Sequence, residues 1–87
     1  MTNSKQQNIY NVIGKNIKKY RQKKGYTQRA LAEKLLLSES FIAKLESDTY
    51  QSISIDTLEQ IAIFLEVDIT IFFDKSVMEE KKELVMS

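Results

Sequence analysis

The side chains best suited to chemistry in this 87-residue chain lie close together near its middle. A serine hydroxyl can pair with several base edges of DNA, a glutamate accepts from the cytosine amino group, and a lysine donates to guanine O6 and N7. Taken alone, each of these residue types is also common on a solvated helix face, and a serine is also common as a helix N-cap. Because they occur together at the start and on one side of a predicted helix, we expect four residues to read bases: Ser38, Glu39, Ser40 and Lys44.

Two short helices joined by a tight turn are predicted to hold these residues. Thr27 is a suitable N-cap for a helix from Gln28 to Leu35, and Ser38 is a suitable N-cap for a helix from Glu39 to Glu46. The small Ala32 on the first of these helices allows the second to approach closely. Such a unit is how a small protein lays one helix in the DNA major groove.

Contacts with the DNA backbone are expected at two places. Unpaired amides at the start of a helix favour a phosphate, although residues there are also typical of an exposed helix start. The segment 47–52 has no Lys or Arg, so hydroxyl and amide groups would have to serve instead. The dependence of binding on salt should then be modest. The predicted backbone residues are Thr27, Gln28, Arg29, Thr49, Tyr50 and Gln51.

Apolar spacing predicts the remaining elements. An apolar residue recurs every three or four positions from about Asn8 to Lys24, which indicates a helix, and Gly25 suits a left-handed residue at its end. Ser54 caps a fourth helix and Asp68 a short fifth element. A strand over 67–73 is the alternative on propensity, but no second strand-like run could pair with it. A capping box at 76–79 predicts a last short helix to about Val85.

Composition excludes several classes of function. The chain has no Cys and no His, which removes disulfides, thiol chemistry and imidazole catalysis, and no cluster of metal ligands or glycine-rich phosphate loop is present. We expect no enzyme activity, no metal and no cofactor. The net charge of +1 hides a split, because residues 1–46 carry ten basic and three acidic side chains and residues 47–87 carry three basic and nine acidic ones. A basic half beside an acidic half suggests one surface that faces a polyanion, although ordinary solvation of helices is an alternative.

Three segments are predicted along the chain. Residues 1–8 are a disordered polar tail, residues 9–75 a DNA-binding domain, and residues 76–87 a helical tail. The polar start lacks the apolar core of a secretory signal, and no apolar run reaches the length of roughly 18 residues that spans a membrane. We therefore expect a cytoplasmic protein that contacts no membrane. A small-molecule ligand is not expected, since no second domain is available to house a pocket.

The motifs together resemble the Cro/repressor-type helix-turn-helix regulators, the Xre-like family. The resemblance covers about residues 12–73 and depends on many positions in register: Ile13-Gly14, Ile17-Lys18, Arg21, Gly25-Tyr26-Thr27-Gln28, Leu31-Ala32, Ser38, Phe41-Ile42, Lys44-Leu45-Glu46, Ser54 to Leu58, Ile61-Ala62 and Leu65. It implies an all-α, compact five-helix domain of the lambda-repressor type that binds double-stranded DNA as a homodimer on a palindromic operator. It also implies a structural ion pair between Arg21 and Glu46.

The resemblance implies a bacterial or phage-encoded protein. Two groups within the family are most similar, and an unassigned repressor of a phage or mobile element is the third alternative. The spacing between Glu46 and Ile55 is similar to that of the DNA-binding region of Sin-type repressors. The short length and the ending over 65–73 are similar to controller proteins of restriction-modification systems. One position departs from the family, because Leu36 lies where the turn usually has glycine. If the turn follows the usual path, Leu36 adopts a left-handed conformation at a cost of roughly 1–2 kcal/mol. Otherwise the backbone of the turn follows a different path.

The end of the chain has more apolar residues than so small a core requires. We assign Ile69 and Phe72 to the core and expect the others to form a two-fold interface, unless all of them close the monomer core. The predicted interface residues are Ile71, Phe73, Val77 and Met78. The sequence thus predicts a DNA-binding transcriptional regulator, most simply a repressor. The alternative is a protein-interaction module, such as an antitoxin or counter-regulator that acts mainly through a partner protein.

Overall fold

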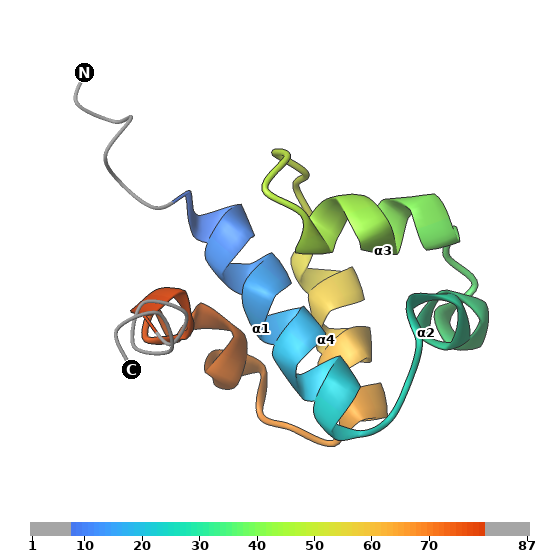
Figure 1. Cartoon of the computed structure of the whole chain (residues 1–87). Helices are drawn as coiled ribbons and strands as arrows, with labels where there is room; N and C mark the ends of the chain where they lie inside the picture. Colours follow the sequence, from blue (N-terminus) through green and yellow to red (C-terminus); the bar gives the residue numbers. More distant parts are fainter. Residues whose placement is uncertain (1–7, 80–87) are drawn as a thin grey trace.

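The computed structural model describes residues 8–79 and contains there only helices, turns and loops (Figure 1). The helices are α1 (Ile9–Lys23), α2 (Gln28–Leu35), α3 (Glu39–Glu46), α4 (Ile55–Leu65) and the 3-10 helix η2 (Ile69–Phe73). The predicted all-α fold with five elements is confirmed, and the segment for which a strand was the alternative forms η2.

α1 is the central element, because α3, α4 and η2 all pack against it (Figure 1). Its apolar stripe is buried as the three- and four-residue spacing predicts, with Val12 and Ile17 both 0% exposed. α2 completes the domain by packing on α3 and α4. The buried core draws on every element: Ile13, Ile17, Leu31, Ala32, Ile42, Leu45, Leu58, Ile61, Ala62, Leu65 and Phe72.

Each helix begins with a side-chain cap. The predicted caps accept from the backbone amides of the first turn, with Thr27 Oγ1 at 3.0 Å from Ala30 N and Ser38 Oγ at 3.0 Å from Phe41 N. Ser54 and Asp68 cap α4 and η2 in the same way, and Asn8 caps α1. These bonds satisfy amides that have no carbonyl partner within the helix, which fixes where each helix starts.

Two helices end with a non-glycine residue in the left-handed region. Leu36 follows α2 with φ 58° and ψ 40°, and the amide of Leu37 donates back to the carbonyl of Ala32 at 2.8 Å. The turn therefore keeps the path usually provided by glycine, and Leu36 bears the strain. Glu66 ends α4 in the same conformation, with φ 61°, which the sequence analysis did not predict. Gly25 after α1 has φ 82° as predicted.

Gly14 allows a close contact between the backbones of α1 and α3. A Cβ atom at this position would lie 1.7 Å from the carbonyl oxygen of Leu45 and 2.7 Å from its carbonyl carbon. The obstacle is backbone, which cannot rotate away as a side chain could. Gly14 thus permits α1 to lie directly against the C-terminal turn of α3.

Asn16 fastens η2 to α1. Its side chain is 1% exposed, and Nδ2 lies 2.9 Å from the carbonyl of Phe72 and 3.0 Å from the carbonyl of Asp74. The carboxylate of Asp74 then accepts from the amide of Ser76 at 2.9 Å. Residues 77–79 are helical, so the predicted C-terminal helix begins there. The rest of that prediction, and residues 1–7 of the tail predicted over 1–8, lie outside the described residues; Asn8, the last residue of that tail, caps α1.

Candidate nucleic-acid interface

α3 presents a polar, exposed face. Glu39, Ser40 and Lys44 are exposed, while Ile42 and Leu45 on the opposite side are buried. The hydroxyl of Ser38 is also exposed, and although its oxygen accepts from Phe41 N it retains a proton to donate. The structure thus places all four predicted base-reading residues on the solvent side of α3 or at its start.

The N-terminus of α2 lies beside α3, with Gln28 bonded to Glu46 at the end of that helix. Thr27 Oγ1 satisfies only the amide of Ala30, so the amides of Gln28 and Arg29 have no acceptor within the helix and remain suited to a phosphate. The guanidinium of Arg29 lies 3.8 Å from a carboxylate oxygen of Glu39. This contact between two exposed side chains joins a predicted backbone residue to a predicted base-reading residue.

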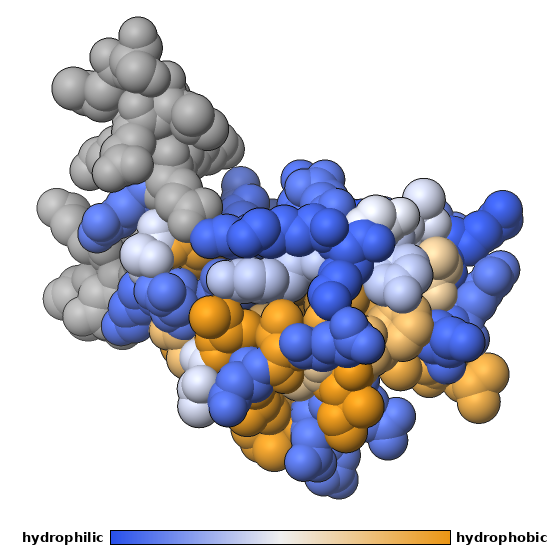
Figure 2. Space-filling model, turned by 90° about the horizontal axis from the view of Figure 1, so that it is seen from below, coloured by the Kyte–Doolittle hydropathy of each residue, from blue (hydrophilic) through white to orange (hydrophobic). Residues whose placement is uncertain are grey.

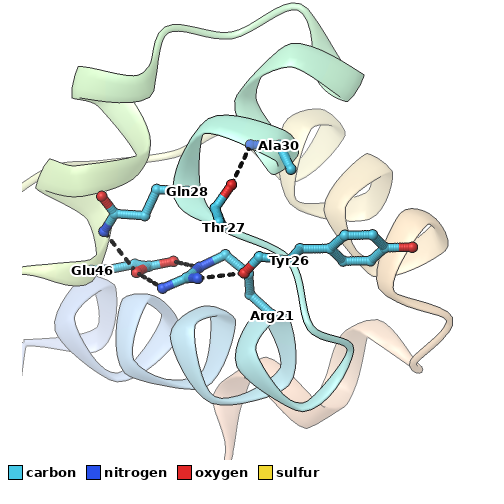
Figure 3. Close-up of polar contacts among 6 residues, drawn as sticks. All are labelled: Arg21, Tyr26, Thr27, Gln28, Ala30 and Glu46. Carbon is cyan, nitrogen blue, oxygen red and sulfur yellow. Dashed lines mark hydrogen bonds and ion pairs between the residues drawn. The ribbon is translucent and has the colours of Figure 1, made fainter.

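A buried ion pair holds α1, α2 and α3 together behind this surface (Figure 3). Arg21 Nε and Nη2 each lie 2.8 Å from an oxygen of Glu46, and Arg21 Nη1 donates to the carbonyl of Tyr26 at 2.6 Å. Both side chains are at least nine-tenths buried. A forked, charge-assisted contact of this kind fixes the relative positions of the helices that carry it. The guanidinium of Arg21 therefore donates its hydrogen bonds to groups within the protein.

Gln28 belongs to the same network. Its Nε2 atom donates to Glu46 Oε1 at 3.0 Å, so the side-chain amide points toward the ion pair (Figure 3). The sequence predicts a contact between Gln28 and the DNA backbone. With the side-chain amide bonded to Glu46, the backbone amide of Gln28 at the open start of α2 remains as a donor for a phosphate.

The loop after α3 is fastened to α1. Lys15 Nζ lies 3.2 Å from Asp48 Oδ1, and the rings of Tyr10 and Tyr50 meet edge to face with centroids 5.5 Å apart. Thr49 and Tyr50 are exposed and Gln51 is partly buried. Sequence reasoning missed Lys15 at this surface, because only the folded structure brings α1 next to a loop more than thirty positions later.

The predicted dimer residues form no uniform surface. Phe73 is 38% exposed, whereas Ile71 is half-buried and packs against the monomer core. Val77 and Met78 are half-buried. Ile63 on α4 is 70% exposed and was not among the predicted residues. Figure 2 shows the side of the molecule that faces away from the α3–α4 loop, where apolar residues gather beside a band of hydrophilic ones.

The described residues offer little for other kinds of site. Within residues 8–79, no group of three or more Asp, Glu, His or Cys side chains could hold a metal ion. None of the helices in that range has the length and apolar character needed to cross a membrane.

Comparison with known proteins agrees with this geometry. A helix-turn-helix family model, HTH_3, matches residues 17–72. The transcriptional regulator SlrR of Bacillus subtilis is 34% identical over 71 residues, which cover 82% of this chain and 47% of SlrR. The regulator SinR of the same organism is 34% identical over 64 residues, which cover 74% of this chain and 58% of SinR. The chain thus spans about half the length of the curated relatives it matches.

A solved structure is similar in fold as well as in sequence. The crystal structure of SinR, a master regulator of biofilm formation, in complex with DNA superposes with a TM-score of 0.66 at 35% identity. The match covers 71% of this chain and 98% of that chain. The predicted resemblance to Sin-type repressors is confirmed. The chain belongs to the helix-turn-helix family of the Cro/repressor type.

Proposed function

We propose that this chain binds double-stranded DNA in a sequence-specific manner and regulates transcription, most simply as a repressor that occupies an operator in the cytoplasm. One observation supports this most strongly. The exposed polar face of α3 belongs to a helix whose C-terminal turn is fixed by three contacts: the buried pair of Arg21 with Glu46, the bond from Gln28 to Glu46 and the close approach of Gly14 to Leu45. The similarity to SinR bound to DNA supports the same function.

Within this proposal the contacts divide between two roles. Ser38, Glu39, Ser40 and Lys44 read base edges, because their side chains are exposed on α3. The backbone amides of Gln28 and Arg29 bind a phosphate at the start of α2. Thr27 caps this helix and so fixes where these amides lie. Thr49, Tyr50 and Gln51 contact the backbone beyond the other end of α3.

The regulator would act as a homodimer on a palindromic operator. Two copies joined through Phe73, Val77, Met78 and the exposed part of Ile71 would present their α3 helices to successive major grooves about 34 Å apart. Support comes from apolar side chains that the monomer core leaves partly exposed at its C-terminal end.

Selection of bound sequences from a random DNA pool tests the proposal directly. We expect a site with two-fold symmetry, and sedimentation of the protein with that site should give two chains per duplex. A pool that shows no enrichment at physiological salt would contradict sequence-specific binding. Enrichment of a single asymmetric half-site, bound by one chain, would contradict the dimer alone.

A further inference from the structure

An ion pair between Lys15 and Asp48 joins α1 to the α3–α4 loop at the surface of the protein. Lys15 Nζ and Asp48 Oδ1 are 3.2 Å apart, and their side chains are 26% and 87% exposed. The side chain of Lys15 is thus mostly covered, while its ammonium is paired with the carboxylate of an exposed residue. The carboxylate that neutralises it is almost fully solvated and free to move.

This link lies where the exposed face of α3 ends. Ser40 and Lys44 are one helical turn apart on that face, and the loop that begins at Ser47 continues from it (Figure 1). The hydroxyl of Ser47 donates back to the carbonyl of Lys44 at 2.9 Å, which fixes Ser47 at the end of α3, directly before Asp48. A phosphate strand flanking a groove occupied by α3 would therefore pass close to Asp48 and Lys15.

A carboxylate at this position opposes DNA binding, whereas an ammonium favours it. The segment 47–52 contains no Lys or Arg of its own, so Lys15 provides the cation that the loop lacks. Resting on the DNA-binding function proposed above, we propose that Lys15 is a phosphate-binding residue, which Asp48 holds in the free protein and releases to a backbone phosphate of double-stranded DNA.

The exchange requires only side chains to move. The ring contact between Tyr10 and Tyr50 holds the loop against α1 independently of the ion pair. When the phosphate replaces Asp48, Lys15 keeps its position and Asp48 turns toward solvent. The exposed hydroxyl of Tyr50 lies in the same loop and is suited to donate to the same strand.

A second exposed ion pair provides matched controls. Lys24 Nζ lies 2.8 Å from Glu66 Oε1 and joins the end of α1 to the end of α4. Lys24 lies nine positions after Lys15, about 14 Å along the helix axis, which exceeds the screening length of about 10 Å at 0.1 M salt. Equivalent substitutions in the two pairs change the net charge equally but act at different places.

The first experiment compares Lys15→Gln with Lys24→Gln. Binding to a short labelled duplex of random sequence is measured by fluorescence anisotropy over a range of salt concentrations. For Lys15→Gln the slope of log K against log salt should be less steep than in the wild type by about 0.9, the value for one phosphate contact. For Lys24→Gln the slope should equal that of the wild type. Equal slopes for the two variants would overturn the proposal.

The second experiment compares Asp48→Asn with Glu66→Gln on the same duplex. Removing the competing carboxylate should raise the affinity about threefold to tenfold for Asp48→Asn, whereas Glu66→Gln should change it less than about twofold. Equal effects of the two variants would show that only net charge matters and would also overturn the proposal. Failure of the wild-type protein to bind any duplex would overturn the proposed function as well, so the two failures can be told apart.

Discussion

The side-chain amide of Gln28 donates a 3.0 Å hydrogen bond to Oε1 of Glu46, which joins the first residue of α2 to the last residue of α3. Glu46 also receives two bonds from Arg21, so one buried carboxylate is shared by three helices. The angle between the helices of the helix-turn-helix unit therefore depends on a single side chain that is buried rather than exposed on α3.

Substitution Glu46→Gln should destabilise the fold because it leaves the buried guanidinium of Arg21 without a counter-charge. We expect the free energy of unfolding to fall by about 3–5 kcal/mol, the usual cost of removing one partner from a buried pair. Urea denaturation followed by circular dichroism measures this. Glu39→Gln, at an exposed position, is the control and should change stability by less than about 0.5 kcal/mol. A double variant Arg21→Met, Glu46→Leu no less stable than Glu46→Gln would show that the unpaired charge is the cause.

Substitution Gly14→Ala should be more damaging than Gly25→Ala. At position 14 the added methyl group would collide with the backbone of Leu45 and separate α1 from α3, which should cost about 3 kcal/mol or more despite the better helix propensity of alanine. At position 25 the space is open and only the left-handed conformation opposes alanine, at a cost of about 1–2 kcal/mol. Thermal denaturation of both variants gives the order directly, and a reversed order would contradict the close packing at Gly14.

Substitution Leu36→Gly should stabilise the protein. The side chain of Leu36 is 92% exposed and contributes little burial, while its left-handed backbone carries a strain that glycine lacks. Glycine loses more chain entropy on folding, so we expect a net gain of about 1 kcal/mol in the free energy of unfolding. Leu36→Ala keeps the Cβ atom and should be nearly neutral. A loss of stability in the glycine variant would show that Leu36 makes a stabilising contact.

Substitution Lys44→Ala should weaken sequence-specific binding by roughly 1–3 kcal/mol and relax the preference for one base. Ser40→Ala should act similarly, with a different base affected. Competition assays with operator variants measure this change. Lys34→Ala removes the same charge from α2, where Lys34 lies 6.0 Å from the ring of Phe64, and should leave base preference unchanged. If Lys44→Ala lowered specific and non-specific affinity by the same factor, Lys44 would not read bases.

Stability should fall in acid. Hydrogen bonds from Thr70 lower the pKa of Asp68, and hydrogen bonds from Ser76 lower the pKa of Asp74. A carboxyl with a lowered pKa in the folded protein stabilises it above the ordinary pKa of about 4, and this contribution is lost as the pH falls through the folded value. Urea denaturation between about pH 5 and pH 2 should show the decline, and Asp68→Asn should make it shallower. An unchanged pH dependence in that variant would contradict the role of Asp68.

Much of the fold could be predicted because its signals are local. The caps at Thr27, Ser38, Ser54 and Asp68 are single residues that act on amides two or three positions away, so they mark the start of each helix within the sequence itself. The buried faces follow from spacing in the same way.

The contacts that could not be predicted join distant positions. Nothing near Asn16 in the sequence indicates that its amide binds carbonyls more than fifty residues later, and nothing near Lys15 indicates that Asp48 lies beside it. Likewise, Gly14 does not lie in a turn, and the reason for a glycine at this position becomes clear only from its contact with the backbone of Leu45. The pair of Arg21 with Glu46 was expected only from family resemblance.

The amide of Asn16 has a consequence for how the protein is made. Its partners at Phe72 and Asp74 are 56 and 58 positions away, so the first helix lacks its final neighbour until nearly all of the domain has left the ribosome. A nascent chain that stops before Phe72 has α1 with part of its apolar stripe uncovered. We therefore expect folding to the native state to follow the emergence of residue 74 from the ribosome, rather than to proceed helix by helix during translation.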